Sequence, residues 1–111
     1  MKNLIEQLRT FAKERDWGQF HSPKNLAMAL SVEVAELVEH FQWLTQAQSD
    51  ITDPKNLEEI KQEIGDILIY LTMLSDKLGI DPIRAAKDKI KINNKKYPIE
   101  TVKGRAKKYN V

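Results

Sequence analysis

Two pairs of acidic residues stand inside apolar stretches between positions 30 and 70, and both pairs have i, i+3 spacing. On an α-helix this spacing places both members of a pair on one face. Carboxylates embedded in core-forming helix are costly unless they are paired or bind a metal ion. The chain must therefore fold in a way that brings a compensating charge to these acids. The four residues are Glu33, Glu36, Glu63 and Asp66.

Clustered carboxylate oxygens are the ligands that a hard divalent cation accepts. We therefore expect a Mg²⁺ site between two antiparallel helices, with Mn²⁺ as a second candidate. The alternative is that the four acids are solvated, which is the commoner state of a single acidic pair. Their apolar neighbours favour the metal site, since Asp66 leads directly into Ile67-Leu68-Ile69. A di-iron centre is disfavoured because His40 follows Glu36 by four residues rather than three.

Apolar residues recur at helical spacing, and no segment alternates convincingly with a period of two. We predict helices over about residues 4–15, 23–43, 54–78 and 82–93. The first is expected to begin at a capping box, and each of the others at an N-cap residue followed by proline. These signals are Asn3 with Glu6, Ser22-Pro23, Asp53-Pro54 and Asp81-Pro82, and Gly79 provides a left-handed stop. The predicted fold is all-α, most simply a four-helix bundle with short connections.

The third predicted helix carries two parallel stripes of residues. The apolar stripe consists of Ile60, Ile64, Ile67, Leu71, Leu74 and Leu78. The second stripe, one residue out of phase, consists of Glu59, Glu63, Asp66 and Tyr70. With the apolar stripe in the core, the neighbouring acids are expected at an edge or cleft.

Size and composition limit the protein class. The 111 residues suffice for one domain with a single modest core, which we assign to residues 1–111. The chain has no cysteine, which excludes disulfides and thiolate-bound zinc. Its start lacks the apolar core of a secretory signal, and no run approaches the roughly 18 apolar residues of a membrane span. We expect a soluble cytoplasmic protein without membrane contact.

Basic residues are concentrated toward the C-terminus. Residues 84–111 hold ten Lys or Arg and two acids, a net charge of +8, whereas residues 1–83 carry −6. One interpretation is a non-enzymatic helical module whose basic tail, from about residue 98, binds nucleic acid or an acidic partner. The other is a site for a small phosphorylated ligand, in which lysines approach metal-bound phosphates. Only the second also uses the acids, and an acidic body would repel nucleic acid.

Aromatic residues lie at both ends of the second predicted helix. The segment Trp17-Gly18-Gln19-Phe20-His21 precedes it, and Trp43 stands at its end. Both a packing role and an aromatic binding surface are open for the segment.

Several stretches carry a family resemblance. Glu33-x-x-Glu36 and Glu63-x-x-Asp66 resemble the E-x-x-E, E-x-x-D signature of the MazG-like all-α nucleoside triphosphate pyrophosphohydrolases. The similarity is closer still to the dCTP pyrophosphatase branch of that family. It is carried, in the same order, by residues 14–21 (ERDWGQFH), 39–43 (EHFQW), 66–71 (DILIYL) and 92–98 (INNKKYP). The resemblance spans about residues 8–109, nearly the whole chain.

The resemblance implies roles for individual residues. Glu33, Glu36, Glu63 and Asp66 fall on the catalytic Mg²⁺ ligands, and Trp17, Gly18, Gln19, Phe20, His21 and Trp43 fall on segments that enclose the base. Tyr70, Lys89 and Asn93 fall on residues that contact the nucleotide. Leu8 departs from the pattern, because the dCTP branch can have a substrate-contacting histidine there. Family members are typically homo-oligomers, dimers or tetramers, whose active sites a neighbouring subunit completes.

The expected function is therefore hydrolysis of a nucleoside triphosphate. The resemblance implies a Mg²⁺-dependent enzyme that cleaves dCTP or a modified dCTP to the monophosphate and pyrophosphate and so cleans the nucleotide pool. Water is the expected nucleophile, since the chain has no cysteine and no G-x-S-x-G motif. It would attack the α-phosphorus while a spare carboxylate accepts its proton and Trp17 and Trp43 stack on the base.

Overall fold

Three of the four long helices begin where an N-cap residue precedes a proline. Ser22 Oγ accepts a hydrogen bond of 3.1 Å from the Asn25 amide. Asp53 Oδ2 accepts one of 3.1 Å from the Asn56 amide. Asp81 Oδ1 accepts from two backbone amides at the start of the next helix. These caps satisfy amides that have no partner inside the helix, so the three predicted starts are confirmed.

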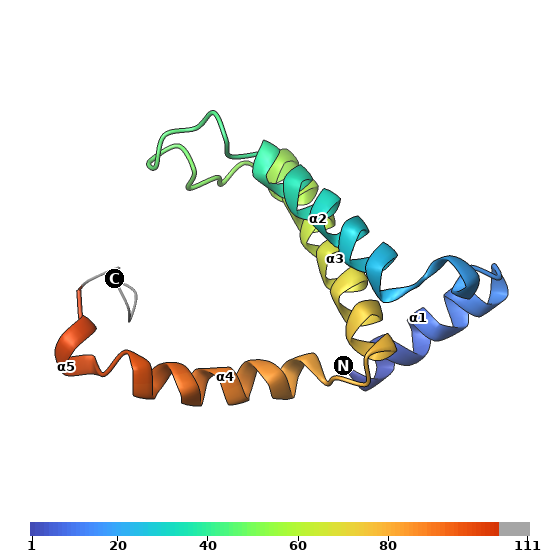
Figure 1. Cartoon of the computed structure of the whole chain (residues 1–111). Coiled ribbons are helices and arrows are strands. Elements are labelled where there is room, and N and C mark those ends of the chain that lie inside the picture. The colour runs from blue at the N-terminus through green and yellow to red at the C-terminus, as the bar shows by residue number, and fades with distance from the viewer. Residues whose placement is uncertain (105–111) are drawn as a thin grey trace. The chain divides into compact units, whose positions relative to one another are not determined.

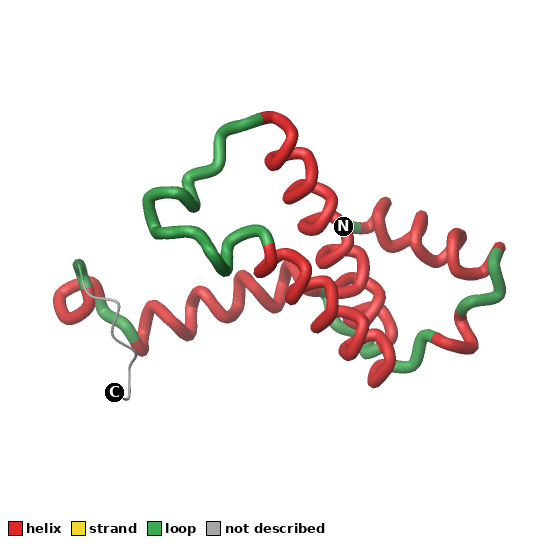
Figure 2. Tube along the Cα trace, turned by 90° about the horizontal axis from the view of Figure 1, so that it is seen from above, coloured by secondary structure: helices red, strands yellow, loops and turns green. Residues whose placement is uncertain are grey.

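The computed structural model describes residues 1–104, and every element in that range is helical (Figures 1 and 2). The elements are α1 (Lys2–Glu14), the 3₁₀ turn η1 (Gly18–Phe20), α2 (Pro23–Glu39), α3 (Pro54–Lys77), α4 (Pro82–Lys96) and the short α5 (Ile99–Val102). The all-α prediction is therefore confirmed for the described residues. None of the helices in this range is long and apolar enough to cross a membrane. The basic tail residues Arg105, Lys107 and Lys108 lie outside it.

The chain divides into two compact units, Met1–Gly79 and Ile80–Val111. In the first unit α2 and α3 lie side by side and run in opposite directions, and α1 packs against α3 (Figure 1). In its described part, the second unit contains α4 and α5. The four long helices that the sequence predicted are thus present, three of them in one unit and the fourth in the other.

Some predicted boundaries are wrong. The capping box at Asn3 does not form, because α1 already begins at Lys2 and has no side-chain cap. Helix α2 ends at Glu39 rather than Trp43. The His40 and Phe41 amides bond to carbonyls three residues back, which tightens the last turn. The connection to α3 therefore covers residues 40–53, which is longer than the connections that we predicted.

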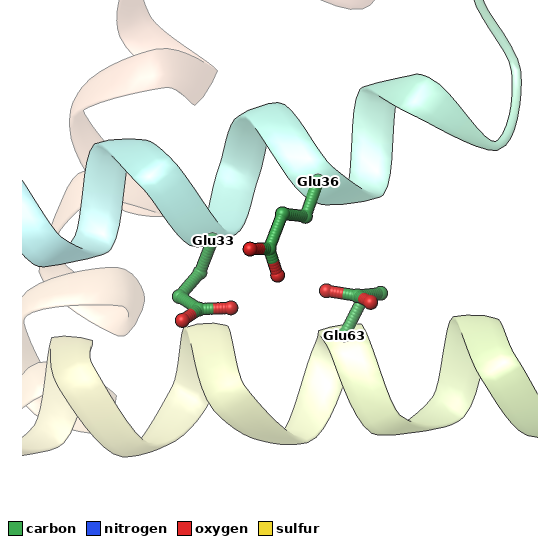
Figure 3. A group of neighbouring side chains, drawn as sticks. All are labelled: Glu33, Glu36 and Glu63. Atoms are coloured by element: carbon green, nitrogen blue, oxygen red, sulfur yellow. The ribbon is translucent and has the colours of Figure 1, made fainter.

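The first unit buries few apolar side chains. Leu26 on α2 and Ile60 on α3 are buried, together with the polar Thr72 and Ser75. The apolar stripe predicted for α3 is only partly in the core, since Ile64 is 54% exposed. Leu71 and Leu78 of the same stripe are also exposed. The prediction that this stripe fills the core is wrong for these three residues, whereas Ile60, Ile67 and Leu74 of the stripe are buried or partly buried. Glu63 lies at the seam with α2 (Figure 3).

Candidate functional site

Glu33 and Glu36 on α2 face Glu63 on α3 across the seam between the two helices (Figure 3). One carboxylate oxygen from each residue lies within 4.8 Å of the other two, and all three residues are partly buried. Because Glu33 and Glu36 are three residues apart on one helix, both reach the same stretch of α3. The structure therefore brings these three acids together, as their spacing predicted.

Two of the three carboxylates, Glu33 and Glu63, lie in an environment that disfavours their charged form. Burial, and next a hydrogen bond and charge repulsion from Glu36, raise the pKa of Glu33 to about 7. Burial is also the first cause that raises the pKa of Glu63. Glu33 Oε2 and Glu63 Oε2 are buried and have no hydrogen-bond partner among the described residues. Such orphaned acceptors are costly, so the residues fit a divalent cation that neutralises the cluster and occupies their lone pairs.

Asp66, the fourth predicted ligand, lies beside the group of three rather than within it. It is exposed, and it follows Glu63 by three residues on α3. Its charge contributes to the raised pKa values of Glu33 and Glu63, so it is close to both. Asp66 also lines a pocket of about 310 Å³ between α1 and α3. This residue therefore connects the acid cluster to the pocket.

The pocket beside Asp66, which we call the aromatic pocket, has mainly aromatic and apolar walls. The Trp17 ring stands edge-to-face with Phe11 at 5.5 Å and with His21 at 6.4 Å between centroids. Tyr70, one turn beyond Asp66 on α3, lines the same pocket. Its remaining lining residues are Leu8, Ile69 and Met73. The volume and the apolar walls suit a small molecule with a flat ring.

A sharp turn after α1 carries Trp17 to the aromatic pocket. The amides of Asp16 and Trp17 bond to the carbonyls of Lys13 and Ala12, which is the pattern of a Schellman turn. Asp16 has the left-handed φ of 53° that this turn requires and that glycine usually supplies. Gln19 Nε2 donates to the Asp16 carbonyl at 3.0 Å and to Asp16 Oδ2 at 3.2 Å. Gln19 therefore stabilises the turn and does not line the aromatic pocket.

The other residues predicted to bind substrate lie elsewhere. Gly18 lines a neighbouring pocket of about 340 Å³ between α1 and α3. Phe20 is 59% exposed and Trp43 is 87% exposed, and neither lines the aromatic pocket. Lys89 and Asn93 are on α4 and belong to the second unit. Of the predicted binding residues, the described structure thus places Trp17, His21 and Tyr70 together beside Asp66.

Three lining residues of the aromatic pocket were not predicted as site residues. Ile69 and Met73 follow Asp66 by three and seven residues, so helical spacing already placed them on its face of α3. Phe11 has no comparable signal, because the sequence only places it on the apolar face of α1. Arg15 covers the Phe11 ring at 3.7 Å from its centroid, which supports the aromatic wall from outside.

Comparisons with known proteins find relatives over most of the chain. The rat (Rattus norvegicus) and human (Homo sapiens) proteins named dCTP pyrophosphatase 1 are 43% and 40% identical to this chain over 101 residues. Each match covers 89% of the chain but only 59% of the relative, so the chain spans less than two thirds of these proteins. A solved structure of a pyrophosphatase from Archaeoglobus fulgidus has a TM-score of 0.78 and 44% identity, covering 88% of this chain and 92% of that one.

A family model agrees with the individual relatives. The model of the MazG-like family matches residues 28–111, a range that includes all four acids and Tyr70. Trp17 and His21 lie before that range, but they belong to residues 14–21, one of the stretches in which the sequence resembles the dCTP pyrophosphatase branch. The chain therefore belongs to the MazG-like family.

Proposed function

We propose that the protein is a metal-dependent nucleoside triphosphate pyrophosphohydrolase that acts on dCTP or a modified dCTP. The observation that carries the proposal is that three converging carboxylates lie next to an aromatic pocket. Asp66, which lines the pocket, lies between the two. A nucleotide needs both, because its phosphates require a cation and its base requires a flat apolar surface. The names of the curated relatives and of the Archaeoglobus fulgidus protein support the same activity.

The acids hold the metal ion in this proposal. Glu33, Glu36 and Glu63 bind a divalent cation, Mg²⁺ or Mn²⁺, through the oxygens that converge at the seam, and Asp66 completes the set from the pocket side. When bound, the cation supplies charge compensation to the phosphates and lowers the pKa of a water molecule. A carboxylate of the set that does not bind the cation accepts a proton from the water molecule that attacks the α-phosphorus. The products are a nucleoside monophosphate and pyrophosphate.

The aromatic pocket receives the base. Trp17 offers a ring face, held by Phe11 and His21, and Tyr70 lines the pocket from α3. Leu8 lines the same pocket, where the dCTP branch can have a histidine. We therefore propose that Leu8 affects which base or sugar the pocket accepts. Stacking tolerates every base, and discrimination therefore depends on edge contacts such as those that His21 can make.

Of the other predicted binding residues, Trp43 is exposed on the first unit, and Lys89 and Asn93 are on the second. We propose a homo-oligomer, a dimer or tetramer, in which Trp43, Lys89 and Asn93 reach a nucleotide together with residues of a neighbouring subunit. The exposure of Trp43 and of the apolar residues on α2 and α3 supports this proposal, since association would cover them. We place the enzyme in the cytoplasm, where nucleoside triphosphates are present.

The test is a panel of nucleoside triphosphates incubated with Mg²⁺, with pyrophosphate and phosphate detected separately. We expect pyrophosphate, and in ¹⁸O-labelled water we expect label in the monophosphate, because the α-phosphorus is attacked. Label in orthophosphate would contradict the proposed reaction. Binding of nucleic acid that is lost on deleting residues 103–111, without any triphosphate hydrolysis by the full chain, would support the helical module instead.

A matched pair of variants tests the acid cluster. Glu63→Gln keeps the shape but removes a charge, so turnover should fall by about a hundredfold or more while the far-UV circular dichroism stays unchanged. Glu59→Gln makes the same change one turn earlier, at an exposed position of α3, and should leave turnover intact. Equal turnover by both variants at saturating Mg²⁺ would overturn the assignment of Glu63.

A further inference from the structure

A second pocket lies between α1 and α3, beside the aromatic pocket, and the proposed function does not use it. Its volume is about 340 Å³, similar to the 310 Å³ of the aromatic pocket. The two pockets are neighbours, because they share the lining residues Leu8, His21 and Met73. All residues that line the second pocket belong to the first unit. We call it the lysine pocket, because Lys13 and Lys77 line it from opposite helices.

The charged lining of the lysine pocket is positive overall. Three cationic side chains and two carboxylates line it, which gives a net charge of +1: Arg9, Lys13 and Lys77, and Asp16 and Asp76. Arg9 donates two hydrogen bonds to Asp76 and neutralises that carboxylate. Neither lysine forms a salt bridge among the described residues. A positive cavity is unusual in this part of the chain, since residues 1–83 carry a net charge of −6.

Both lysines lie in the last turn of their helices, where a cation interacts favourably with the helix dipole. That effect accounts for each lysine separately, but it does not explain why one cavity receives both. Lys13 follows Arg9 by four residues on the same face of α1, and Lys77 directly follows Asp76. The Arg9–Asp76 ion pair therefore keeps the two lysines on facing walls of the pocket.

The lysine pocket also contains a buried hydroxyl group without a strong partner. Thr72 lines the pocket and is 1% exposed. Its Oγ1 donates to Met1 Sδ at 4.0 Å, and a thioether sulfur is a weak acceptor. Ser75, one turn later, instead donates to the Leu71 carbonyl at 2.8 Å. A buried hydroxyl group is costly without a good hydrogen bond, so Thr72 indicates a polar ligand in this pocket.

We infer that the lysine pocket binds a small organic phosphate, and that its occupation weakens nucleotide binding in the aromatic pocket. Lysine binds phosphate oxygens as a point charge, and two lysines on facing walls can hold one phosphate group. Thr72 can donate a hydrogen bond to the same ligand. The organic part packs on the apolar lining residues, which are Ile5, Leu8, Ala12 and Met73.

The shared wall makes the two pockets interdependent, and this part of the inference rests on the proposed function. A ligand in the lysine pocket contacts Leu8 and Met73 from one side, and a base in the aromatic pocket contacts them from the other. A bound phosphate also adds negative charge near a site that receives a triphosphate. Both effects oppose simultaneous binding, and by linkage each ligand lowers the affinity of the other by the same factor.

The direct test is calorimetric titration of the full chain with phenyl phosphate in the presence of a chelator, so that no cation attracts phosphate to the acids. We expect one molecule bound per chain. Inorganic phosphate and phenol should each bind at least tenfold more weakly, because the first lacks the apolar part and the second lacks the charge. A parent protein that does not bind phenyl phosphate overturns the inference.

A matched set of variants tests the two lysines. Lys13→Met combined with Lys77→Met should lower the affinity for phenyl phosphate by about tenfold or more, because both charges are lost. Lys61→Met makes the same change at an exposed position of α3 that lines neither pocket, and it should leave the affinity unchanged. An equal loss in both proteins would show general attraction of anions to the surface and overturns the inference.

The location can be measured in the parent protein without any substitution. In ¹H–¹⁵N correlation spectra, phenyl phosphate should shift the amide signals of Lys13, Thr72 and Lys77, which line only the lysine pocket. Shifts confined to Asp66 and Tyr70, which line only the aromatic pocket, would place the ligand there and overturn the inference.

Steady-state kinetics test the coupling between the pockets. Phenyl phosphate should raise the KM for dCTP to a plateau, by about fivefold, because both ligands still bind together at saturation. The double lysine variant should show no such rise, and its turnover without phenyl phosphate should match that of the parent protein. A KM that rises without limit would indicate competition for a single site and overturns the proposed coupling.

These measurements also separate the inference from the proposed function. Pyrophosphate release by a protein that does not bind phenyl phosphate overturns only the inference. Phenyl phosphate binding that depends on Lys13 and Lys77, in a protein that releases no pyrophosphate from any triphosphate, supports the lysine pocket and overturns the proposed function.

Discussion

Glu33 shows most clearly how charge and burial conflict in this protein. Its pKa is raised to about 7, first by burial and then by Glu36, from an ordinary value of about 4.5. Between pH 4.5 and about 7, Glu33 is therefore protonated in the folded protein but ionised in the unfolded chain. The fold is stabilised by this proton at low pH, and that contribution is lost as the pH rises toward 7. Asp76, whose pKa is lowered by Arg9, titrates below this window.

The first prediction concerns this pH dependence. With a chelator present, the melting temperature should fall as the pH is raised from about 5 to about 8. Excess Mg²⁺ should raise the melting temperature more at pH 8 than at pH 5.5, because protons compete with the cation for the carboxylates. Glu33→Gln should flatten the dependence in the chelator and weaken the response to Mg²⁺. A metal-free melting temperature that rises over the same interval would contradict the raised pKa.

The second prediction concerns Asp16. A left-handed φ costs a residue with a Cβ roughly 1 kcal/mol relative to glycine, and Asp16 offsets part of this cost through Gln19. Asp16→Ala and Asp16→Gly both remove the carboxylate, but only alanine retains the backbone cost. Asp16→Ala should therefore be less stable than Asp16→Gly by about 1 kcal/mol in urea unfolding. Equal stability of the two variants would show that the turn relaxes when the side chain is removed.

At the scale of the elements, a bidentate ion pair fastens α1 to α3. Arg9 Nε and Nη2 donate to the two carboxylate oxygens of Asp76 at 2.9 Å and 2.6 Å. The Asp76 side chain is 26% exposed, whereas Arg9 is 64% exposed and therefore well screened by water. Helix α1 contributes Leu8 and Phe11 to the aromatic pocket. The position of α1 thus determines one wall of the proposed base site.

The third prediction follows from this contact. Asp76→Asn keeps the shape but removes the charge pair, so the free energy of unfolding should decrease by about 1 kcal/mol or less. Because the wall of the pocket loosens while the acids stay in place, KM should rise more than kcat falls. The double variant Arg9→Asp, Asp76→Arg should recover part of both losses. A double variant no better than the sum of the two single variants would show that the pair does not position α1.

At the scale of the whole molecule, a single chain leaves much apolar surface uncovered. Val32, Val34 and Val38 on α2 are exposed, as are Ile64 and Leu71 on α3. Exposed apolar surface of this extent is typical of an interface between subunits. Burying one isoleucine contributes roughly 1.5–3 kcal/mol, so a few such residues stabilise a dimer.

The fourth prediction tests the proposed homo-oligomer by sedimentation. The parent protein should sediment with two or four times the 12.9 kDa mass of one chain. Ile64→Glu should shift the protein toward the monomer. It should also lower the affinity for nucleotide, because in the proposed assembly a neighbouring subunit completes the site. Gln62→Glu adds the same charge to an exposed polar position of α3 and should leave the assembly unchanged. A monomeric parent protein with full activity would contradict the proposed assembly.

Features that depend on neighbours in the chain were predictable from the sequence. Ser22, Asp53 and Asp81 cap their helices as predicted, since a cap requires only the next three residues. The i, i+3 spacing likewise determined that Glu33 and Glu36 share a face. The sequence also predicted the all-α class, because helical periodicity is a local property.

Features that depend on how helices rotate and dock were decided only by the tertiary structure. Glu63 lies at the seam with α2 although the sequence predicted the apolar stripe in the core, and Ile64 of that stripe is exposed. Docking also placed Asp66 beside the aromatic pocket and left Trp43 exposed. His40 came within 3.8 Å of Glu63 for the same reason. These contacts join residues far apart in the chain, and periodicity within one helix carries no information about its rotation against another.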